Sequence, residues 1–462
     1  MKHPKTRVLI SAILMLFSLS VSAQTQKMTL SQAVDYALSH SAQAQNANLD
    51  IKNSEQEVKS IVSTGLPQVN GSFNFTHNVQ IASMQLPDFI SPAVYGVLIN
   101  EGLLPQDRFR AGMPQTVQFG APSSLTGMVN LNQLVFDGTY FLGLKAAKQY
   151  VLLSEFLRDN THASVSEQTQ KAFFGALIAE QNVGLVDQSL INIRKTYEET
   201  LALQKAGFAE QLDVDRLKLS MTQLETQSLN LKLQRDVLMK ILKVTIGMDV
   251  NAPLELEGDL ANYLKVAPTA TKADIQNRPE YQVLQQQLIM DSMNIKRYKV
   301  GYLPSLTLNA SYQQNSFASE AEFKGLGKTW NPGTSYGFNL SIPIFDGLYK
   351  QAKLSQAKIQ LEQDQNTFRQ TANSLLFQAE QSKLNLQMQE RTLATQKQSR
   401  DLALTIYETT LKKFNEGVAT SFELVKADSD KTAAEIDYHN AIYQRLLAQI
   451  ELDKSLGNLI KK

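Results

Sequence analysis

The two carboxylates whose positions repeat along this chain are the first candidates for chemistry. Asp213 and Glu423 each lie six residues after a glycine, Gly207 and Gly417 respectively, where a short break separates two helix-patterned segments. A carboxylate in the first turn of a helix complements the positive end of the helix dipole. The sequence therefore predicts at least an electrostatic role for both residues, at two equivalent places in the fold.

Residue patterns typical of enzymes are missing from the sequence. The chain has no cysteine, no glycine-rich phosphate loop and no zinc-ligand spacing. The net charge is +1, without the basic stripe that a nucleic-acid partner requires. We therefore expect no enzymatic activity, no cofactor, no metal and no nucleic acid. Four scattered histidines are expected to be surface or packing residues rather than ligands: His40, His77, His162 and His439.

The carboxylates belong to two halves of the chain that repeat each other at an offset of about 210 residues. A period this long indicates a duplicated architectural unit rather than a short solenoid repeat. We expect each half to run helix, strand, loop, strand, very long helix, tight break, helix. The recurring landmarks are Phe136-Asp137-Gly138 with Phe345-Asp346-Gly347, Gly207 with Gly417, and Gly247 with Gly457.

The N-terminus is typical of a secretory signal peptide. Basic residues precede the apolar stretch from Val8 to Leu19, and Val21-Ser22-Ala23 fits a cleavage site. An uncleaved anchor helix is the alternative, but the apolar run is short for a bilayer crossing. The expected segments are the signal peptide at 1–23, a first repeat at 24–247, an equatorial linker at 248–272, a second repeat at 273–457 and a short C-terminal tail at 458–462.

Two proline-free regions carry helical patterning over unusual lengths. The pattern predicts helices of nearly 70 residues, from about Thr139 to Lys205 and from about Leu348 to Asn415. At ~1.5 Å per residue each would be ~100 Å long. The shorter partner helices show heptad spacing, with alanine, serine and arginine mixed into the seam. Such a seam favours helices packed around a wet interior, and an ordinary antiparallel coiled-coil hairpin is the alternative.

Four segments of about ten residues alternate apolar and polar residues, at the length of a tilted strand that crosses a bilayer. Their polar residues are mainly Asn, Ser and Thr, which favours a barrel lumen; a soluble sheet with one wet face is the alternative. The segments are 69–79, 129–135, 306–313 and 338–344. We expect Asn70, Asn74, Asn309 and Asn339 to face the lumen, and Phe73, Leu308 and Leu340 to face lipid.

Four strands cannot close a conducting barrel. An open sheet in lipid would leave its edge groups without hydrogen-bond partners, so membrane-spanning strands require an oligomer. The loop between the first two strands, from about Gln80 to Ser124, is about 28 residues longer than its counterpart. Loops longer than ~15 residues are usually functional or mobile, and on this topology the loop faces outside and could cap the mouth. Trp330 precedes the fourth strand, where an interfacial or a loop-packing role is expected.

Together these features resemble the TolC-type outer-membrane efflux proteins, the outer membrane factors, over essentially the whole mature chain. Each motif is weak alone, but their order, spacing and duplication are specific. The residues that carry the resemblance are Leu66-Pro67 and Leu303-Pro304 at strand starts, the two Phe-Asp-Gly sequences at the strand-helix junctions, the glycine breaks at Gly207 and Gly417, and Arg278-Pro279-Glu280 at a helix start.

The resemblance implies an α+β membrane protein, internally duplicated, with four β-strands per protomer completing a trimeric twelve-stranded outer-membrane barrel. A long periplasmic α-helical barrel continues it. The implied function is a passive conduit in a tripartite efflux or type I secretion system of a Gram-negative bacterium. The implied partners are two further copies of the chain, a periplasmic adaptor protein, an inner-membrane RND or ABC transporter, and outer-membrane lipid.

The resemblance also assigns roles near the glycine breaks. It implies that Gly207-Phe208 and Gly417-Val418 form adaptor-docking tips, although Ala206 and Glu416 replace the valine that opens each family triplet. It places Asp213 and Glu423 at acidic positions of the periplasmic aperture. Lys426 and Ala419 depart from an acidic residue and an arginine in the family, so the locking network must differ in detail.

A structural coiled-coil envelope protein without a transport role is the alternative function. A stalk of that kind has no need of four lumen-type strands in each chain. The duplicated strand pairs therefore favour the conduit.

Overall fold

The computed structural model describes residues 26–109, 112–118, 120–264, 275–318 and 326–459, which fall into two compact units. Unit 1 takes its residues from 1–56, 148–292 and 357–462, and unit 2 consists of 57–147 and 293–356. The expected signal peptide at 1–23, part of the expected linker and the last three residues of the expected tail lie outside the described residues.

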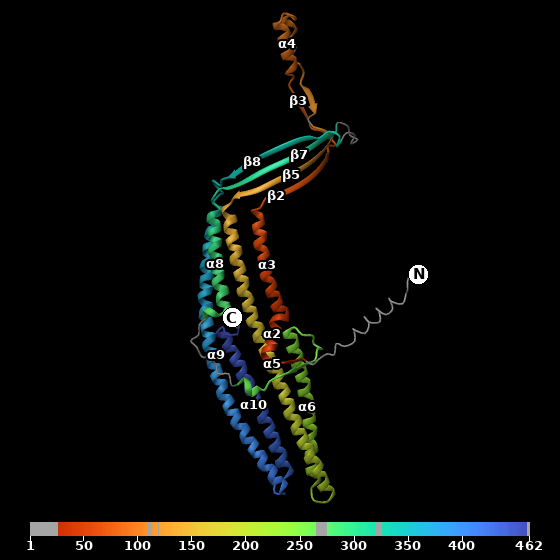
Figure 1. Ribbon diagram of the computed structural model, residues 1–462, viewed down its shortest axis with the longest axis vertical. Helices are drawn as coiled ribbons and strands as arrows, with labels where there is room; N and C mark the ends of the chain where they lie inside the picture. Colours follow the sequence, from red (N-terminus) through yellow and green to blue (C-terminus); the bar gives the residue numbers. More distant parts are fainter. Residues whose placement is uncertain (1–25, 110–111, 119, 265–274, 319–325, 460–462) are drawn as a thin grey trace, which may run out of the picture. The chain divides into compact units, whose positions relative to one another are not determined.

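Long helices dominate the chain (Figure 1). The longest is α5, with 68 residues, and α9 has 67. Their observed bounds differ by a single residue at the N-terminal end from those that the sequence predicts. Outside residues 78–122, the described helices of at least eleven residues are α2 (Leu30–His40), α3 (Ala42–Thr64), α5 (Gly138–Lys205), α6 (Gln211–Ile246), α8 (Pro279–Val300), α9 (Tyr349–Asn415) and α10 (Ser421–Ser455).

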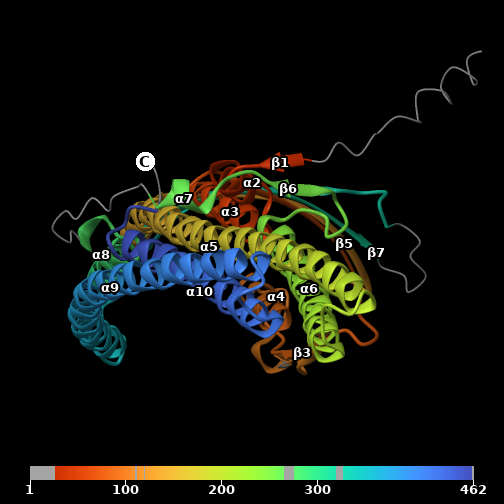
Figure 2. The ribbon, with the colours of Figure 1, turned by 90° about the horizontal axis from the view of Figure 1, so that it is seen from below.

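Four of these helices, α5, α6, α9 and α10, lie side by side in unit 1 (Figure 2). Arg194 of α5 pairs with Glu225 of α6 at 2.9 Å, so the two helices form an antiparallel hairpin. Arg400 of α9 lies over the ring of Tyr438 on α10, 4.4 Å from its centroid, so α9 and α10 form the second hairpin. Among the described helices, none combines the length and apolar character that a membrane crossing needs.

The hydrophobic core of unit 1 lies where α2, α5, α6 and α10 meet a two-stranded parallel sheet. Phe173 is fully buried and lies edge-on to Phe174, with 5.9 Å between ring centroids. Tyr263 of α7 completes this aromatic cluster, 5.2 Å from Phe174. The short elements around it are β1 (Gln26–Met28), β6 (Leu254–Leu256), α7 (Leu260–Tyr263) and the 3₁₀ turn η2 (Ile275–Asn277).

The glycines that follow α6 and α10 show the duplication in detail. Gly247 and Gly457 have φ angles of +80° and +75°, which glycine adopts at little steric cost. A Cβ at Gly247 would lie 2.5 Å from the carbonyl oxygen of His40, and one at Gly457 would lie 3.2 Å from that of Asn277. Each glycine therefore lies where the last helix of a repeat ends against another segment. Gly247 meets the end of α2, just before α3, and Gly457 meets the turn just before α8.

Unit 2 is built around one antiparallel sheet with the order β2-β5-β7-β8 (Figure 1). The strands are β2 (Gln68–His77), β5 (Ser123–Phe136), β7 (Ser305–Ala318) and β8 (Asn331–Ser341). The pair β5–β7 joins the first repeat to the second. The prediction for the fourth strand was wrong at its end, because β8 stops before Ile342 and Ile344. Pro343 between them has no N–H to donate to a strand ladder.

The strand register divides the sheet into a polar and an apolar face. Asn70 pairs with Asn130, and Asn130 pairs with Ser311. The hydroxyls of Ser311 and Ser335 then lie 2.8 Å apart, which carries the polar row across all four strands. By the same register, the four asparagines predicted for one face share it, and Phe73, Leu308 and Leu340 share the other. The two-faced division of residues is confirmed; what each face contacts stays a prediction.

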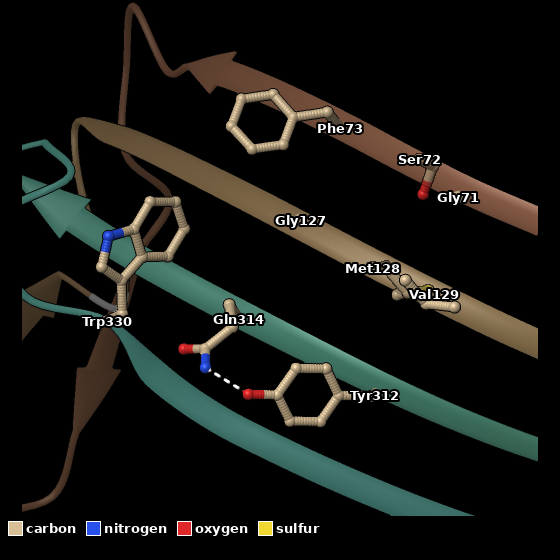
Figure 3. A pocket seen from close by; sticks show the side chains of 9 residues that line it. All are labelled: Gly71, Ser72, Phe73, Gly127, Met128, Val129, Tyr312, Gln314 and Trp330. Atoms are coloured by element: carbon tan, nitrogen blue, oxygen red, sulfur yellow. Dashed lines mark hydrogen bonds between the residues drawn. The ribbon is translucent and has the colours of Figure 1, made fainter.

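The apolar face carries a depression in which aromatic and small residues lie together (Figure 3). The ring of Phe73 lies 3.3 Å from where a Cβ of Gly127 would be, so the ring covers the glycine of the neighbouring strand. Gln314 is polar, but its amide donates to the hydroxyl of Tyr312 at 2.5 Å. Gln133, another polar residue on this face, donates to the carbonyl oxygen of Gly65 at 2.8 Å. Each amide nitrogen thus has an acceptor within the chain, whereas Oε1 of Gln314 is buried without a partner.

The long first loop contains secondary structure that the sequence analysis did not predict. Its backbone forms a small antiparallel hairpin with a helix between the strands. The elements are β3 (Ser83–Leu86), α4 (Ile90–Asn100), the 3₁₀ turn η1 (Gln106–Arg108) and β4 (Gln115–Gln118). The insertion begins after β2 ends and closes before β5 begins, at the end of β5 opposite its junction with α5.

Candidate functional site at the helix turns

The turns that join α5 to α6 and α9 to α10 lie at the same end of unit 1 (Figure 1). Gly207 and Gly417 have φ angles of +84° and +75°, which supports the choice of glycine at both positions. In the first turn, the Gly207 amide donates to Gln204 and the Phe208 amide to Leu203. The second turn repeats this pattern with Gly417 and Val418. Both are Schellman motifs, which satisfy the last carbonyls of the preceding helix.

The apolar residues after these glycines point away from the protein core. Phe208 is 82% exposed and Val418 is 73% exposed. A Schellman motif usually places such a residue against an apolar side chain one turn earlier. That earlier position is Leu203 in the first turn, itself 49% exposed, and Lys413 in the second. Two exposed apolar residues therefore mark the end of the helical region.

Asp213 connects the two helix hairpins. The Ser421 hydroxyl at the start of α10 donates to the Asp213 carboxylate in the first turn of α6, at 2.5 Å. One turn further along α6, the Arg216 guanidinium lies over the ring of Phe422, 5.2 Å from its centroid. The first-turn carboxylate that the sequence identified thus takes part in a contact between residues more than 200 positions apart.

Glu423 has a different, local set of partners. Its carboxylate accepts from the Thr420 backbone amide at 2.8 Å and the Thr420 hydroxyl at 3.1 Å, and its own amide donates back to that hydroxyl. This is a capping box, in which two free donors at a helix start are satisfied reciprocally. The hydrogen bonds from Thr420 hold the pKa of Glu423 below its ordinary value. The geometry agrees with the helix-end interpretation, and an additional aperture role stays a prediction.

The two positions that depart from the family pattern also have local partners. Lys426 pairs with Asp430 one turn later on α10, at 2.6 Å. Ala419 contributes only a backbone amide, which donates to the carbonyl oxygen of Lys413. Both positions thus have local partners, and the expected difference in the locking contacts stays a prediction.

A buried carboxylate lies further along α10. Asp428 is 2% exposed, and the Ser189 hydroxyl of α5 donates to it. Lys431, at 3.7 Å, is its ion-pair partner. Burial raises the pKa of Asp428, against the opposing effects of Ser189 and Lys431. The sequence does not single out Asp428, because one aspartate within a heptad-spaced helix carries no signal of its burial.

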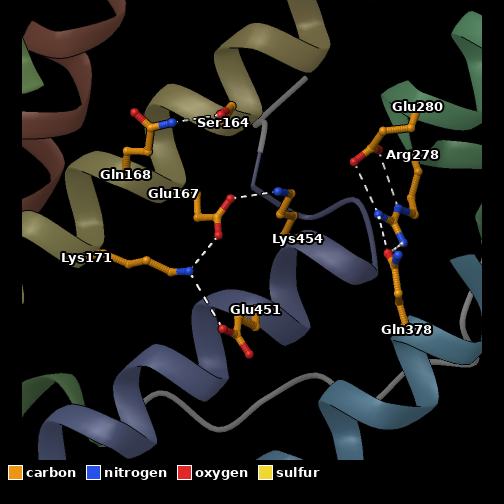
Figure 4. A network of polar contacts seen from close by, with 9 residues as sticks. All are labelled: Ser164, Glu167, Gln168, Lys171, Arg278, Glu280, Gln378, Glu451 and Lys454. Atoms are coloured by element: carbon orange, nitrogen blue, oxygen red, sulfur yellow. Dashed lines mark hydrogen bonds and ion pairs between the residues drawn. The ribbon is translucent and has the colours of Figure 1, made fainter.

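Nearer the core, a polar network ties α5 to α10 and α8 to α9 (Figure 4). Glu167 binds Lys171 at 2.7 Å and Lys454 at 2.8 Å, and Lys171 also lies 3.7 Å from Glu451. Burial raises the pKa of Glu167, but the two ammonium groups outweigh burial and hold the pKa below its ordinary value. In a separate group, the buried Arg278 binds Glu280 of α8 and Gln378 of α9. Opposite charges alternate here, so we interpret the network as structural.

The first Phe-Asp-Gly sequence positions the start of α5. The Asp137 carboxylate accepts from the amides of Thr139 at 2.6 Å and Tyr140 at 3.2 Å, which caps the helix. A Cβ on Gly138 would lie 2.3 Å from Cγ1 of Val300 at the end of α8. The glycine is therefore needed for close approach of two helices. Phe136 is partly exposed, at 40%.

The second Phe-Asp-Gly sequence works differently. Gly347 has a φ of +66°, and a Cβ there would meet open space. Leu348 also has a φ of +66°, in a region that L-residues rarely adopt. Asp346 accepts from the Lys350 amide at 3.1 Å, and Phe345 is 80% exposed. Equivalent sequence motifs therefore serve a close contact in one repeat and a left-handed turn in the other.

No group of three or more His, Cys, Asp or Glu side chains placed to hold a metal ion occurs in the part of the chain that the structure describes. Three residues at the turns were missed by sequence reasoning: Ser421, Arg216 and Phe422. The spacing Thr420-x-x-Glu423 was an available capping-box signal for the start of α10. No comparable local signal existed for the contacts between α6 and α10, because their partners are far apart in the sequence.

Comparison with known proteins gives a consistent result. The family model described as Outer membrane efflux protein matches residues 272–458. The chain is 22% identical over 349 residues to the solvent efflux pump outer membrane protein SrpC of Pseudomonas putida, covering 70% of this chain and 71% of the relative. It is 24% identical over 326 residues to the outer membrane protein OprJ of Pseudomonas aeruginosa, covering 68% and 65%.

The fold has solved counterparts. The crystal structure of the open state of the Neisseria gonorrhoeae MtrE outer membrane channel superposes with a TM-score of 0.68 at 18% identity, covering 93% of this chain and 89% of that one. The arrangement of a four-stranded sheet with long helix hairpins is therefore the fold of these channels, as the sequence predicted.

Proposed function

Because the chain belongs to the outer membrane efflux protein family, we propose that it is the outer-membrane channel of a tripartite efflux or type I secretion system. In this role it is a passive conduit from a periplasmic adaptor and an inner-membrane pump to the exterior. It carries out no chemistry itself. The relatives SrpC and OprJ support the outer-membrane location, and the name of SrpC supports efflux as the transport process.

The observation that carries the proposal is the four-stranded sheet with two open edges. Within the described residues, β2 and β8 each pair on one side only. Open edges in lipid would leave backbone donors and acceptors unsatisfied at several kcal/mol each. Pairing β8 of one protomer with β2 of the next in a closed ring satisfies them. A ring of three protomers gives twelve strands, and the polar row from Asn70 to Ser335 then lines a wet lumen.

The four long helices support the periplasmic part of this proposal. Their hairpins end in turns with exposed Phe208 and Val418, which suit the surface of an adaptor protein. Asp213 and Glu423 lie beside those turns, where three copies of each would concentrate negative potential in a narrow passage. The inner-membrane transporter, of the RND or ABC type, would supply both energy and selectivity.

A structural stalk without transport is not favoured. All four predicted strands pair in one sheet, with one mainly polar face and one mainly apolar face. A stalk built from helix hairpins would gain nothing from this sheet.

Assembly and conductance test the proposal together. The full-length protein, extracted from outer membranes with detergent, should have the native mass of three chains, and should form ion-conducting channels in planar bilayers. A stable monomer that needs no detergent, or trimers that never conduct, would refute it. Loss of drug or solvent resistance on gene deletion, restored by the intact gene, would distinguish efflux from protein secretion.

A further inference from the structure

The helix α4 packs against its own chain only in part, where Tyr95 meets Phe109 edge-on with 6.1 Å between the ring centroids. No residue of α4 is buried. Ile90, Val94 and Val97 are 63%, 50% and 62% exposed. No charged residue occurs from Phe89 to Asn100. An apolar helix exposed to water on an aqueous exterior is unfavourable, and such a patch marks a contact surface.

Both ends of α4 are capped, so the helix is not a chance turn in a loop. The Asp88 carboxylate accepts from the amides of Ile90 at 3.0 Å and Ser91 at 2.9 Å. At the other end, Gly102 has a φ of +71° and donates to Ile99, while Leu103 donates to Leu98 at 2.9 Å. This is again a Schellman motif. Residues encoded in the sequence therefore define both ends of α4.

The exposed apolar residues form one stripe along α4. Ile90, Val94 and Val97 follow a spacing of four and then three, which places them on one side of a helix. They correspond to the d, a and d positions of a heptad, and β-branched residues at both a and d favour bundles of three or four helices. Ala93 and Gly96 flank the stripe and leave room for close approach.

We propose that three α4 helices, one from each protomer, pack against one another through the Ile90–Val94–Val97 stripe and form an apolar cap over the outer mouth. This inference rests on the proposed trimeric channel. It commits to further copies of this chain as the occupant of the stripe.

Continuity with the edge strand brings these copies together. The insertion that carries α4 leaves the sheet directly after β2, which is the open edge expected to pair with the next protomer. The sheet ladder closes at His77 opposite Ser123, and the Asn78 amide extends it to the carbonyl oxygen of Pro122 at 2.8 Å. The helix therefore begins beyond the strand ends, outside the span that lipid would cover. Tethering three copies in one ring raises their effective concentration into the range where short helices associate.

Disulfide trapping tests the contact directly, because the chain contains no native cysteine. The variants are Val94→Cys and Val97→Cys, with Ile99→Cys as the matched control. Ile99 lies two positions from Val97, and therefore about 200° away around the helix. Copper-catalysed oxidation of whole cells should give covalent dimers at Val94→Cys and Val97→Cys, several-fold more than at Ile99→Cys.

A second change keeps the test independent of thiol reactivity. Val97→Glu in the Val94→Cys background would place three carboxylates in the cap, and the yield of dimers should fall several-fold while trimers persist. An unchanged yield overturns the proposal, as does equal trapping at Ile99→Cys. Absence of trapping at both stripe positions in intact trimers overturns it too, and so does a product with a foreign protein. Native mass measurement separates the two failures. If no trimers form, both the proposed channel and the proposed cap are refuted; if trimers form without trapping, only the cap is refuted.

Discussion

The two helix turns of this protein close in the same way but hold their first-turn carboxylates differently. Both use a glycine with positive φ and a Schellman motif, and both expose an apolar residue. In the first repeat, Asp213 reaches across to Ser421 of the other hairpin. In the second, Glu423 stays within its own helix start and completes a capping box. Duplication thus preserved the backbone geometry, while the side-chain contacts diverged into one between hairpins and one within a helix.

The strand-helix junctions show the same divergence. Gly138 is held by close packing against Val300, whereas Gly347 is held by its backbone conformation alone. A motif repeated in the sequence therefore does not imply a repeated physical reason. Substitutions at equivalent positions should show which residues have the same physical role in both repeats and which do not.

The largest effect is expected at the shared feature, the exposed apolar tips. Phe208→Glu together with Val418→Glu should abolish export and adaptor cross-linking, because a charge on each turn cannot dock on an apolar surface. Phe208→Leu with Val418→Ile is the matched control, and should retain export. Trimer assembly and delivery to the outer membrane should be unchanged in both. Export that survives the charged pair would place docking elsewhere, and failure to form trimers would make these residues structural.

The junction glycines should respond unequally to alanine. Gly138→Ala places a Cβ against Val300 and should destabilise the protein by roughly 1–3 kcal/mol, the range for overpacking. Gly347→Ala should cost about 1–2 kcal/mol, from positive φ alone. Val300→Ala should partly rescue Gly138→Ala and leave Gly347→Ala unaffected. Denaturation of detergent-solubilised trimers measures each effect. Rescue of both variants, or of neither, would contradict the difference between the junctions.

Substitutions at the two helix turns should separate the effect of the negative charges from the effect of the Ser421–Asp213 contact. Asp213→Asn with Glu423→Gln should lower cation preference in planar bilayers by roughly twofold and weaken block by multivalent cations, because negative potential in the passage falls. Ser421→Ala keeps both charges and removes only the donor to Asp213, so ion preference should stay intact. If the double variant keeps its selectivity and block, the helix-end interpretation alone remains.

The smallest expected effect is on the pH dependence of stability, to which two carboxylates of α10 contribute with opposite signs. The pKa of Glu423 is lowered by Thr420, so its stabilising effect is present above the ordinary pKa of ~4.3 and is lost as the pH falls through the lowered pKa. The pKa of Asp428 is raised by burial, so the folded state gains stability as the pH falls through that raised value. Asp428→Asn keeps an acceptor for Ser189 but cannot take up a proton, so it should remove this gain in stability at low pH.

Melting of wild-type and Asp428→Asn trimers from neutral pH down through the acidic range measures this difference. We expect the melting temperature of the wild type to rise relative to that of the variant as the pH falls. Equal pH profiles for the two proteins would show that Asp428 does not change its protonation there.

Local sequence signals were sufficient for the two longest helices, the four strands of the main sheet and the glycine turns. Proline-free periodicity predicted α5 and α9 to within a residue at each end. Alternation predicted the four strands and the two faces of their sheet, although β5 and β7 proved longer, and β8 ended earlier at the segment containing Pro343. Glycine spacing predicted the turns. These features depend on neighbours within a few residues, where the chain's own chemistry decides the backbone.

Only the tertiary structure could decide which partners the side chains meet. The bond from Ser421 to Asp213, the approach of Gly138 to Val300 and the burial of Asp428 against Ser189 each join residues more than 150 positions apart. No local pattern encodes such pairs, because their distance depends on how separate helices pack. The helix α4 was missed because its capped apolar segment lies in a proline-containing loop, and its exposure is visible only once the chain is folded.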